Sequence, residues 1–353
     1  MTTNQEQQSS GFFKGKNRWR IAAIGILAAI ILIVVAGFGF AYLQNPIKQY
    51  TGQPEPITIG TSPIEVSGLL FIAENQGFFE DNGLNATIKG YDAGALAMKD
   101  LEAGTIDIAT SSELVFTRNV LNNKQMHGIA SIGTSDFEYI IARKDSGIAN
   151  VSDLKGKKIG VARGTSADFY LSRFLALNGI NPQDVTIINL KPANMTEPLK
   201  NGEVDAVSTW DPYASAVVNY FGDAVLVWPS QEGQLMYWIA NYKNDLLTDR
   251  PEIIVRFLRS LSQAEDFVVN HPDEAKKIVQ NRLGSDDAYI DKIWPKTHLM
   301  LSLDQSLILA AEDETRWLIE NNLTTSKEMP NYLEYFCTED LLVVQPEAVK
   351  IIR

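Results

Sequence analysis

Residues 151–180 read VSDLKGKKIGVARGTSADFYLSRFLALNGI, and the order of features within them decides the fold class. The apolar run at 158–162 is typical of a buried strand, whereas residues 166–178 space their apolar side chains as an amphipathic helix does. A short polar loop, residues 163–165, joins the two. This stretch therefore predicts a strand-loop-helix unit of an α/β protein.

The same alternation continues on both sides of this unit. Towards the C-terminus, strand-like runs follow at DVTIINL (184–190) and DAVSTW (205–210), with a short helical stretch between them that ends near Gly202. An earlier series of strand-like runs, separated by helical stretches, comprises ITIGT (57–61), LNATIKGY (84–91) and IDIAT (106–110). Beyond residue 243 the pattern is helical. We therefore expect two tandem α/β units with parallel strands covered by helices.

Length and composition agree with this interpretation and exclude other classes. At about 150 residues per domain, 353 residues correspond to about two domains. The chain is 45% hydrophobic and 21% charged, as in ordinary globular proteins. Its net charge of −12 opposes binding to the nucleic-acid backbone, so we predict no nucleic-acid partner. The single cysteine, Cys337, has no partner for an internal disulfide or a paired metal site.

Near the N-terminus, residues 21–43 read IAAIGILAAIILIVVAGFGFAYL, which is 23 positions without a charge. As a helix this run would be about 35 Å long, enough to cross a hydrocarbon core of about 30 Å. The basic tail, residues 1–20, carries four Lys and Arg side chains against one Glu. By the positive-inside rule the tail is cytoplasmic and the rest of the chain lies outside. The prediction is a single-pass protein of the cell membrane with an extracytoplasmic soluble domain.

A cleaved signal peptide is the alternative, because Gly39-Phe40-Ala41 resembles a cleavage site, and the protein would then be secreted or periplasmic. A lipid anchor is excluded, since it needs a cysteine just after the apolar run and Cys337 is the only one. Residues 44–56, QNPIKQYTGQPEP, are typical of an extended linker. We expect the folded part to begin near Ile57.

In open α/β sheets, ligands bind beyond the carboxyl ends of the strands. Five predicted strand ends carry hydroxyl side chains, at residues 60–62, 110–112, 134–135, 164–166 and 209–210. Each Ser or Thr alone can equally cap a helix. Their convergence on one edge nevertheless indicates a small-ligand site, which includes Ser62 and Gly164. Trp210 can be a core aromatic or an apolar wall of that site.

Four segments, taken in order, resemble the nitrate/sulfonate/taurine-type substrate-binding proteins of ABC importers. They are IGTSPIEVSGLLFIAENQGFFEDNGLNATI (59–88), ALAMKDLEAGTIDIATSSE (95–113), residues 151–180, and LKNGEVDAVSTWDPYAS (199–215). The resemblance covers about residues 57–280. It implies a two-lobed periplasmic-binding-protein-like (type 2) α/β fold, joined by a two-segment hinge and preceded here by the predicted transmembrane helix.

The resemblance also implies a division of the chain and a function. Lobe 1 is expected at 57–142 and again at 243–353 with the C-terminal helices, and lobe 2 at 143–242. The chain is expected to capture a small organic anion or zwitterion of the sulfonate, taurine, nitrate or carboxylate class. It would deliver the solute to ABC permease and ATPase subunits as a monomer, without a cofactor.

Carried over residue by residue, the family's pocket corresponds to Ser67, Gly68, Ser112, Thr134, Thr165, Ser166, Trp210 and Asp211. Thr165 and Ser166 would bind the anionic group, and Asp211 would meet an amine such as that of taurine. Glu113 departs from the family pattern, in which small or apolar residues are common at that position. This departure argues against a simple anionic substrate.

Two other classes of function stay open. One is an anchored sensory domain that passes ligand occupancy to a separate partner. The other is an enzyme, because the same fold hosts pyrimidine-precursor and chorismate-processing enzymes. The three histidines, His127, His271 and His298, lie outside the strand-end loops, and no Ser-His-Asp set, metal cluster or glycine-rich phosphate loop is present in the sequence. We therefore predict no catalytic residue and no metal site.

Overall fold

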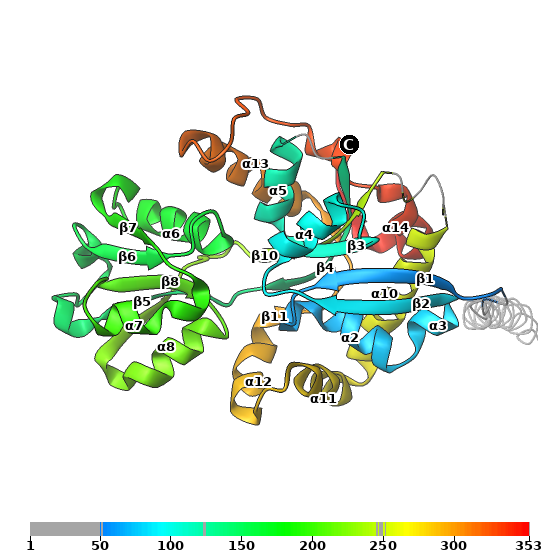
Figure 1. The fold of residues 1–353 in the computed structure, drawn as a ribbon, viewed down its shortest axis with the longest axis horizontal. Helices are drawn as coiled ribbons and strands as arrows, with labels where there is room; N and C mark the ends of the chain where they lie inside the picture. The colour runs from blue at the N-terminus through cyan, green and yellow to red at the C-terminus, as the bar shows by residue number, and fades with distance from the viewer. Residues whose placement is uncertain are drawn as a thin grey trace, which may run out of the picture. The chain divides into compact units, whose positions relative to one another are not determined.

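The computed structural model describes residues 50, 52–122, 125–244, 246, 250 and 252–352, and Gly52–Arg353 form one compact unit (Figure 1). The predicted basic tail, the predicted transmembrane helix and the first part of the predicted linker lie outside these residues. Among the helices within them, none is long and apolar enough to cross a membrane.

The larger of two main sheets has six strands and defines what we call the first lobe. Its strand order is β11 (Thr297–His298), β4 (Met126–Ser135), β10 (Met236–Lys243), β3 (Ile108–Ser112), β1 (Glu55–Thr61) and β2 (Leu84–Gly90). The strands β1, β2 and β3 are parallel, as predicted. Strand β10 lies between β3 and β4 and runs antiparallel to both.

The second lobe is built on a five-stranded sheet. Its order is β7 (Thr186–Asn189), β6 (Lys158–Val161), β8 (Ala206–Trp210), β5 (Glu138–Arg143) and β9 (Val225–Pro229). Strand β6 is parallel to β7 and β8, whereas β5 is antiparallel to β8 and β9. A further pair, β12 (Leu303–Asp304) and β13 (Val349–Lys350), is parallel.

Helices cover both sheets (Figure 1). Those that follow first-lobe strands or lie in the C-terminal part are α2 (Gly68–Asn75), α3 (Phe78–Asp81), α4 (Gly94–Glu102), α5 (Glu113–Leu121), α10 (Ile253–Asn270), α11 (Pro272–Leu283), α12 (Asp287–Ile293), α13 (Gln305–Glu320) and α14 (Thr338–Val344). In the second lobe, α6 (Ser166–Leu177) lies on one side of the sheet and α7 (Thr196–Lys200) and α8 (Tyr213–Phe221) on the other. The 3-10 turns are η1 (Glu65–Ser67), η2 (Lys144–Ser146), η3 (Val151–Leu154), η4 (Pro182–Asp184), η5 (Pro192–Asn194), η6 (Gly222–Ala224), η7 (Trp294–Lys296), η8 (Tyr332–Tyr335) and η9 (Pro346–Ala348).

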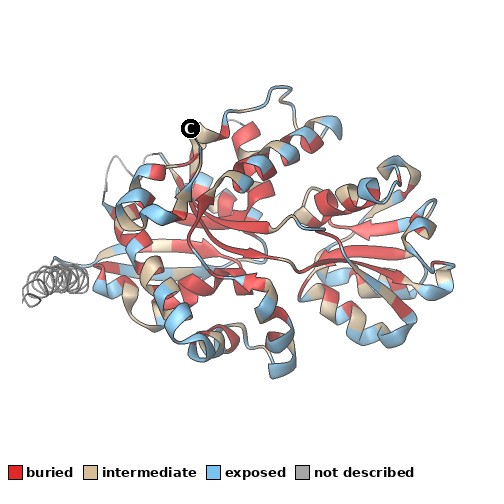
Figure 2. Ribbon diagram, turned by 180° about the vertical axis from the view of Figure 1, so that it is seen from behind, coloured by how far each residue is buried: buried red, intermediate tan, exposed pale blue. Residues whose placement is uncertain are grey.

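The apolar periodicity explains why these helices form. The helical pattern predicted beyond residue 243 includes α10, on whose buried face Ile254, Phe257 and Leu261 are fully buried. Helix α13 begins after Asp304, whose carboxylate accepts a hydrogen bond from the N–H of Leu307 at 3.1 Å, a good N-cap. Buried residues concentrate in the strands of both sheets and on the inner faces of the helices (Figure 2).

The chain passes between the sheets twice, from β4 to β5 and from β9 to β10. Strand β5, which starts at residue 138, already pairs in the second sheet, and β10, which starts at residue 236, already pairs in the first. The two crossings therefore lie before these strands, ahead of the predicted lobe boundaries after residues 142 and 242. Gln231 ties the crossings together: its Nε2 donates to the carbonyl of Ser135 at 2.8 Å, and its Oε1 accepts from the N–H of Glu138 at 3.0 Å. The two-segment connection is therefore held by side-chain hydrogen bonds as well as by the chain.

Strand β1 begins at Glu55, inside the predicted linker. Glu55 and Pro56 pair in register with Leu84 and Asn85 of β2, and Arg256 on α10 donates to the Glu55 carboxylate at 2.5 Å. The proline-rich composition predicted a linker up to residue 56. Pro56 nevertheless stands near the beginning of β1, where a residue without an N–H is compatible with strand pairing.

Gly94 marks a close approach of backbone to backbone at the start of α4. A Cβ at this position would lie 2.8 Å from Cα of Ser111 and 2.9 Å from the carbonyl oxygen of Thr110, both on β3. Gly94→Val is therefore expected to push α4 off the sheet and to destabilise the protein by about 1–3 kcal/mol. Urea unfolding measures this as a lower midpoint with an unchanged slope. Gly90→Ala is the matched control, because within the part of the chain that the structure describes no atom lies within 4 Å of its added Cβ, and an equal loss in both variants would contradict this packing.

Candidate ligand-binding site

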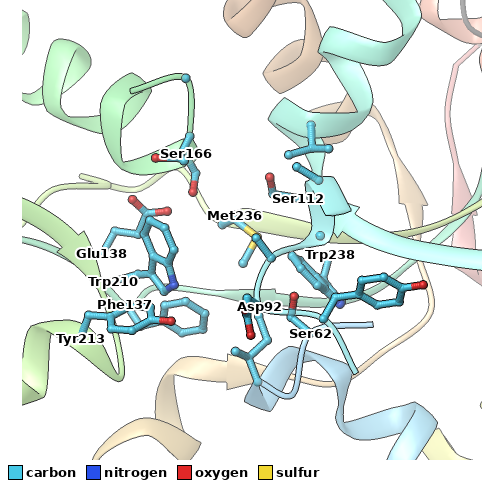
Figure 3. A pocket seen from close by; sticks show the side chains of 18 of the residues that line it. Ser62, Asp92, Ser112, Phe137, Glu138, Ser166, Trp210, Tyr213, Met236 and Trp238 are labelled. Atoms are coloured by element: carbon cyan, nitrogen blue, oxygen red, sulfur yellow. The ribbon is translucent and has the colours of Figure 1, made fainter. Parts of the chain in front are cut away.

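A cavity of about 470 Å³ lies between the two lobes, with walls from both (Figure 3). Its first-lobe wall comes from the loops after β1 and β2, the start of α5 and the start of β10, and its second-lobe wall from the start of β5, the loop after β6 and the end of β8. In Figure 3, Glu138, Trp210, Phe137 and Tyr213 lie on one side of the cavity, and Ser62, Asp92 and Trp238 lie on the other. This is the edge at which the sequence predicted a ligand site.

Six of the predicted site residues line the cavity: Ser62, Ser112, Gly164, Thr165, Ser166 and Trp210. Their hydroxyls are not used as helix caps. Ser112 and Thr165 are the N-cap residues of α5 and α6, yet neither side chain makes a capping hydrogen bond, and the Thr165 hydroxyl donates to the carbonyl of Ala162 at 2.7 Å. The Ser62 hydroxyl is buried and has no hydrogen-bond partner among the described residues. Capping therefore does not account for these side chains, and Ser62 Oγ is free to bind a ligand.

Four predicted site residues lie outside the lining: Ser67, Gly68, Thr134 and Asp211. The Ser67 hydroxyl donates to the carbonyl of Ser62 at 2.9 Å and so shapes the lining loop after β1. Gly68 packs against Leu299, and Thr134 pairs with Tyr237 of β10 inside the sheet.

Asp211 is fully buried and is engaged by protein groups. Its Oδ1 accepts from the backbone N–H of Ser215 at 2.9 Å, and its Oδ2 lies 3.1 Å from Nζ of Lys292. Ser215 belongs to α8 of the second lobe, and Lys292 to α12, which leads into β11 of the first sheet. Asp211 therefore stabilises the start of α8 and connects the two lobes.

Several lining residues were missed from the sequence, and Arg118 is the most informative. Ser112, Val115 and Arg118 follow one another at intervals of three residues at the start of α5 and along it, so the three share one helix face. That spacing is a signal that sequence reasoning could have used. Nη1 of Arg118 donates to the carbonyl of Gly164 at 2.9 Å, which links α5 to the loop after β6. Residues 91–95, which follow β2, were not predicted because this strand end carries no Ser or Thr.

Three helices of eight or more residues begin at the cavity. The start of α4 is represented by Ala93 and Gly94, that of α5 by Ser112, and that of α6 by Thr165 and Ser166. The first backbone N–H groups of a helix have no intrahelical partner, and the helix dipole favours an anion beside them. Together with the Arg118 guanidinium, these starts place donors and positive partial charge at a cavity that also carries the acidic side chains of Asp92 and Glu138.

The rest of the lining is largely apolar and includes several aromatic side chains. Trp210 and Tyr213 make an edge-on contact, with ring centroids 5.8 Å apart and planes at 82°. Phe137, in the first crossing between the sheets, lines the cavity, and so do Met236 and Trp238 of β10. Such walls suit an organic body that carries a few polar groups.

Two carboxyl groups with raised pKa values lie at or behind the cavity. Glu138 lines it and is 1% exposed, and burial raises its pKa to about 8. Glu113, the residue that departs from the family pattern, lies outside the lining and is completely buried, and burial raises its pKa to about 7. It accepts hydrogen bonds from the Tyr170 hydroxyl at 3.1 Å and the Tyr237 N–H at 3.0 Å. Glu113 therefore joins α5, α6 and β10 behind the site.

Curated relatives of this chain include binding proteins for sulfur-containing solutes. A protein of Bacillus subtilis named as an aliphatic sulfonates-binding protein is 27% identical over 297 residues, which cover 82% of this chain and 87% of the relative. The taurine-binding periplasmic protein of Escherichia coli is 26% identical over 212 residues, which cover 58% of this chain and 64% of the relative.

Solved structures share the fold. The periplasmic aliphatic sulphonate binding protein SsuA from Escherichia coli superposes with a TM-score of 0.67 at 20% identity, covering 80% of this chain and 97% of SsuA. The desulfurization enzyme DszB has a TM-score of 0.64 at 15% identity, with 83% and 99% covered. The periplasmic-binding-protein-like fold predicted from the resemblance is thus confirmed. The sequence matches the NMT1/THI5 like family over residues 65–275, and this chain belongs to that family.

Proposed function

We propose that this protein is the extracytoplasmic solute-binding component of an ABC importer and that it captures a small organic anion or zwitterion of the sulfonate and taurine class. The observation that carries the proposal is the cavity between the lobes, at which the helices α4, α5 and α6 all begin. The sulfonate- and taurine-binding relatives support the solute class. The anionic group would lie against the free N–H groups of these helix starts, the Arg118 side chain and the hydroxyls of Ser62, Thr165 and Ser166.

Binding proceeds by closure of the two lobes over the solute. Only the two crossing segments connect the sheets covalently, and a ligand that contacts both walls stabilises the closed arrangement. The closed arrangement is then the form that a permease and its ATPase recognise. The monomer is the unit of this mechanism, because both walls of the cavity come from one chain.

The apolar run at residues 21–43 would serve as a membrane anchor that keeps the binding unit beside its permease, with the cleaved signal as the alternative. The acidic net charge of −12 requires that an anionic solute be held by local N–H groups and hydroxyls.

Binding rather than catalysis is the proposed activity. The curated sulfonate and taurine relatives are named as binding proteins, whereas DszB shows that the same fold also serves an enzyme. The likeness to DszB is at 15% identity and concerns the fold alone.

The melting temperature of the full chain, measured against a panel of aliphatic sulfonates, taurine, nitrate, carboxylates and amines, tests the proposal. A ligand that binds the native state alone, at a free concentration a hundred times its Kd, stabilises that state by about 3 kcal/mol. This raises the melting temperature by several degrees. We expect such a shift with at least one sulfonate or aminosulfonate. A panel without any shift at concentrations well above millimolar would contradict the proposal.

The ion pair between Lys292 and Asp211 crosses from one lobe to the other and provides a test of closure. Lys292→Ala removes this contact and shifts the protein towards open arrangements, so solute Kd is expected to rise roughly 5-fold. The control is Lys276→Ala, which removes the ion pair with Asp291 between α11 and α12, on one side of the cleft. Calorimetric titration of both variants measures the difference; an equal effect of both would show that the interlobe pair has no part in closure.

A further inference from the structure

Glu138 is the buried carboxyl group of the cavity, and its position is fixed by the backbone. It is the first residue of β5, directly after the first crossing between the sheets. Its N–H donates to Gln231 at 3.0 Å and its carbonyl accepts from the N–H of Ser230 at 2.9 Å. Glu138 pairs in register with Trp210, so both side chains lie on the same face of the sheet (Figure 3).

The carboxyl group of Glu138 has an unused hydrogen-bonding atom. Oε2 is buried and has no partner among the described residues, although the side chain is only 1% exposed. A buried polar atom without a partner is costly, and native proteins retain one mainly where a ligand or water completes it. Glu138 lines the cavity, where Figure 3 shows its carboxyl group near Ser166, so a hydrogen-bond donor on the ligand is a natural partner for the unused oxygen.

The surroundings of this atom favour a nitrogen as that donor. Figure 3 shows Trp210 beside Glu138, Tyr213 contacts Trp210 edge-on, and aromatic faces attract ammonium groups. The Arg118 side chain and the starts of α4 and α5 belong to the opposite wall, from the first lobe. A solute that carries an anionic group and a nitrogen would therefore complement both walls at once.

Resting on the proposed function, we propose that Glu138 is the specificity-determining residue of the site and that it binds an N–H-donating nitrogen of the solute. The solute class is an organic zwitterion with an amine and an anionic group, rather than nitrate or a plain alkanesulfonate. The amine role expected for Asp211 passes to Glu138, because the Asp211 carboxylate is already engaged by Ser215 and Lys292. This assignment also explains why an acidic side chain lies in a cavity otherwise suited to anions.

Pairs of sulfonates that differ only in an amino group test the assignment: taurine against ethanesulfonate, and 3-aminopropanesulfonate against propanesulfonate. By titration calorimetry on the full chain at pH 8, we expect the amino member of each pair to bind about 10-fold or more tightly, as for a charge-assisted hydrogen bond. Glu138→Gln keeps the shape of the side chain and should remove this preference while retaining the amino-free sulfonates. The matched control, Glu265→Gln, alters a half-buried carboxyl group outside the cavity and should keep the preference.

The pH dependence separates a binding role from a structural one. Burial raises the pKa of Glu138 to about 8 in the empty site, so an ammonium group must displace its proton at lower pH. The titratable and charged groups that interact with it or share its cavity are Glu113 and Arg118 on α5, Tyr170 on α6, Arg163 in the loop after β6, Tyr91 and Asp92 after β2, and Tyr213 on α8. Taurine affinity is expected to rise about 10-fold or more from pH 6 to pH 8 in the wild type, and this slope should be absent in Glu138→Gln.

The role of Glu138 and the solute-binding function can be tested separately. Equal affinity for both members of each pair, or a preference that survives Glu138→Gln, would overturn the assignment of Glu138 and leave the solute-binding function intact. Failure of all four sulfonates to bind would overturn the assignment together with the proposed solute class.

Discussion

Glu314→Gln is expected to raise the free energy of unfolding at pH 8 by about 2–3 kcal/mol and to leave it unchanged at pH 5. Glu314 on α13 and Glu113 on α5 are completely buried neighbours, and burial, reinforced by the charge of Glu113, raises the pKa of Glu314 well above its ordinary value. Glutamine removes the charge, keeps an acceptor for the Thr117 hydroxyl, which now donates to Oε2 at 3.1 Å, and can donate to Glu113.

The sign follows from the direction of the pKa shifts. A carboxyl group whose pKa is higher in the folded than in the unfolded state stabilises the fold fully below its unfolded value, and this contribution is lost as pH rises through the folded value. For Glu113 that window runs from its ordinary 4.5 to about 7, which corresponds to about 3 kcal/mol. Wild-type stability should therefore fall between about pH 5 and pH 8.

Chemical denaturation at several pH values measures this slope. Glu312→Gln, on the more exposed side of the same helix, is the control and should keep the wild-type slope. A wild-type stability that stays level from pH 5 to pH 8, or a Glu314→Gln variant with the same decline as the wild type, would show that the buried pair is ionised without cost.

Trp210→Ala should weaken solute binding about 30- to 100-fold, the largest effect expected of any single lining residue. Trp210 ends β8, contacts Tyr213 edge-on and stands beside Glu138, so its loss removes an apolar wall and admits water to the carboxyl group. Trp228→Ala is the matched control: Trp228 lies on β9 of the same sheet, opposite Ile140 of β5, and outside the cavity. Calorimetric titration of both variants with taurine should show loss of affinity in the first alone. A Trp210→Ala variant with the wild-type Kd would show that the solute binds elsewhere.

Much of the architecture could be predicted because it follows from local patterns. Apolar runs and amphipathic stretches identified β1, β3, β6, β8 and α6 within a few residues of their bounds. The parallel strands place their carboxyl ends at one edge, which is why Ser62, Ser112 and Ser166, far apart in the sequence, meet at one cavity.

The features that were not predicted depend on pairing and on tertiary burial. Neither the assignment of β5 to the second sheet nor that of β10 to the first can be read from alternation alone, because both strands are simply apolar. The partners of acidic side chains also depend on tertiary contacts. Asp211, next to Trp210 in the sequence, was predicted to contact the ligand, but it forms an ion pair with Lys292, which is distant in the sequence. Glu138 was missed because its place in the cavity results from the crossing between the lobes.

A crystal structure of the full chain with taurine tests the central claim, capture of a solute between the lobes, most directly. We predict density for one molecule in the cavity, with its sulfonate against the helix starts and Arg118 and its nitrogen at Glu138, in contact with both walls. Taurine bound outside this cavity, or bound to one lobe without contact to the other, would contradict capture by closure.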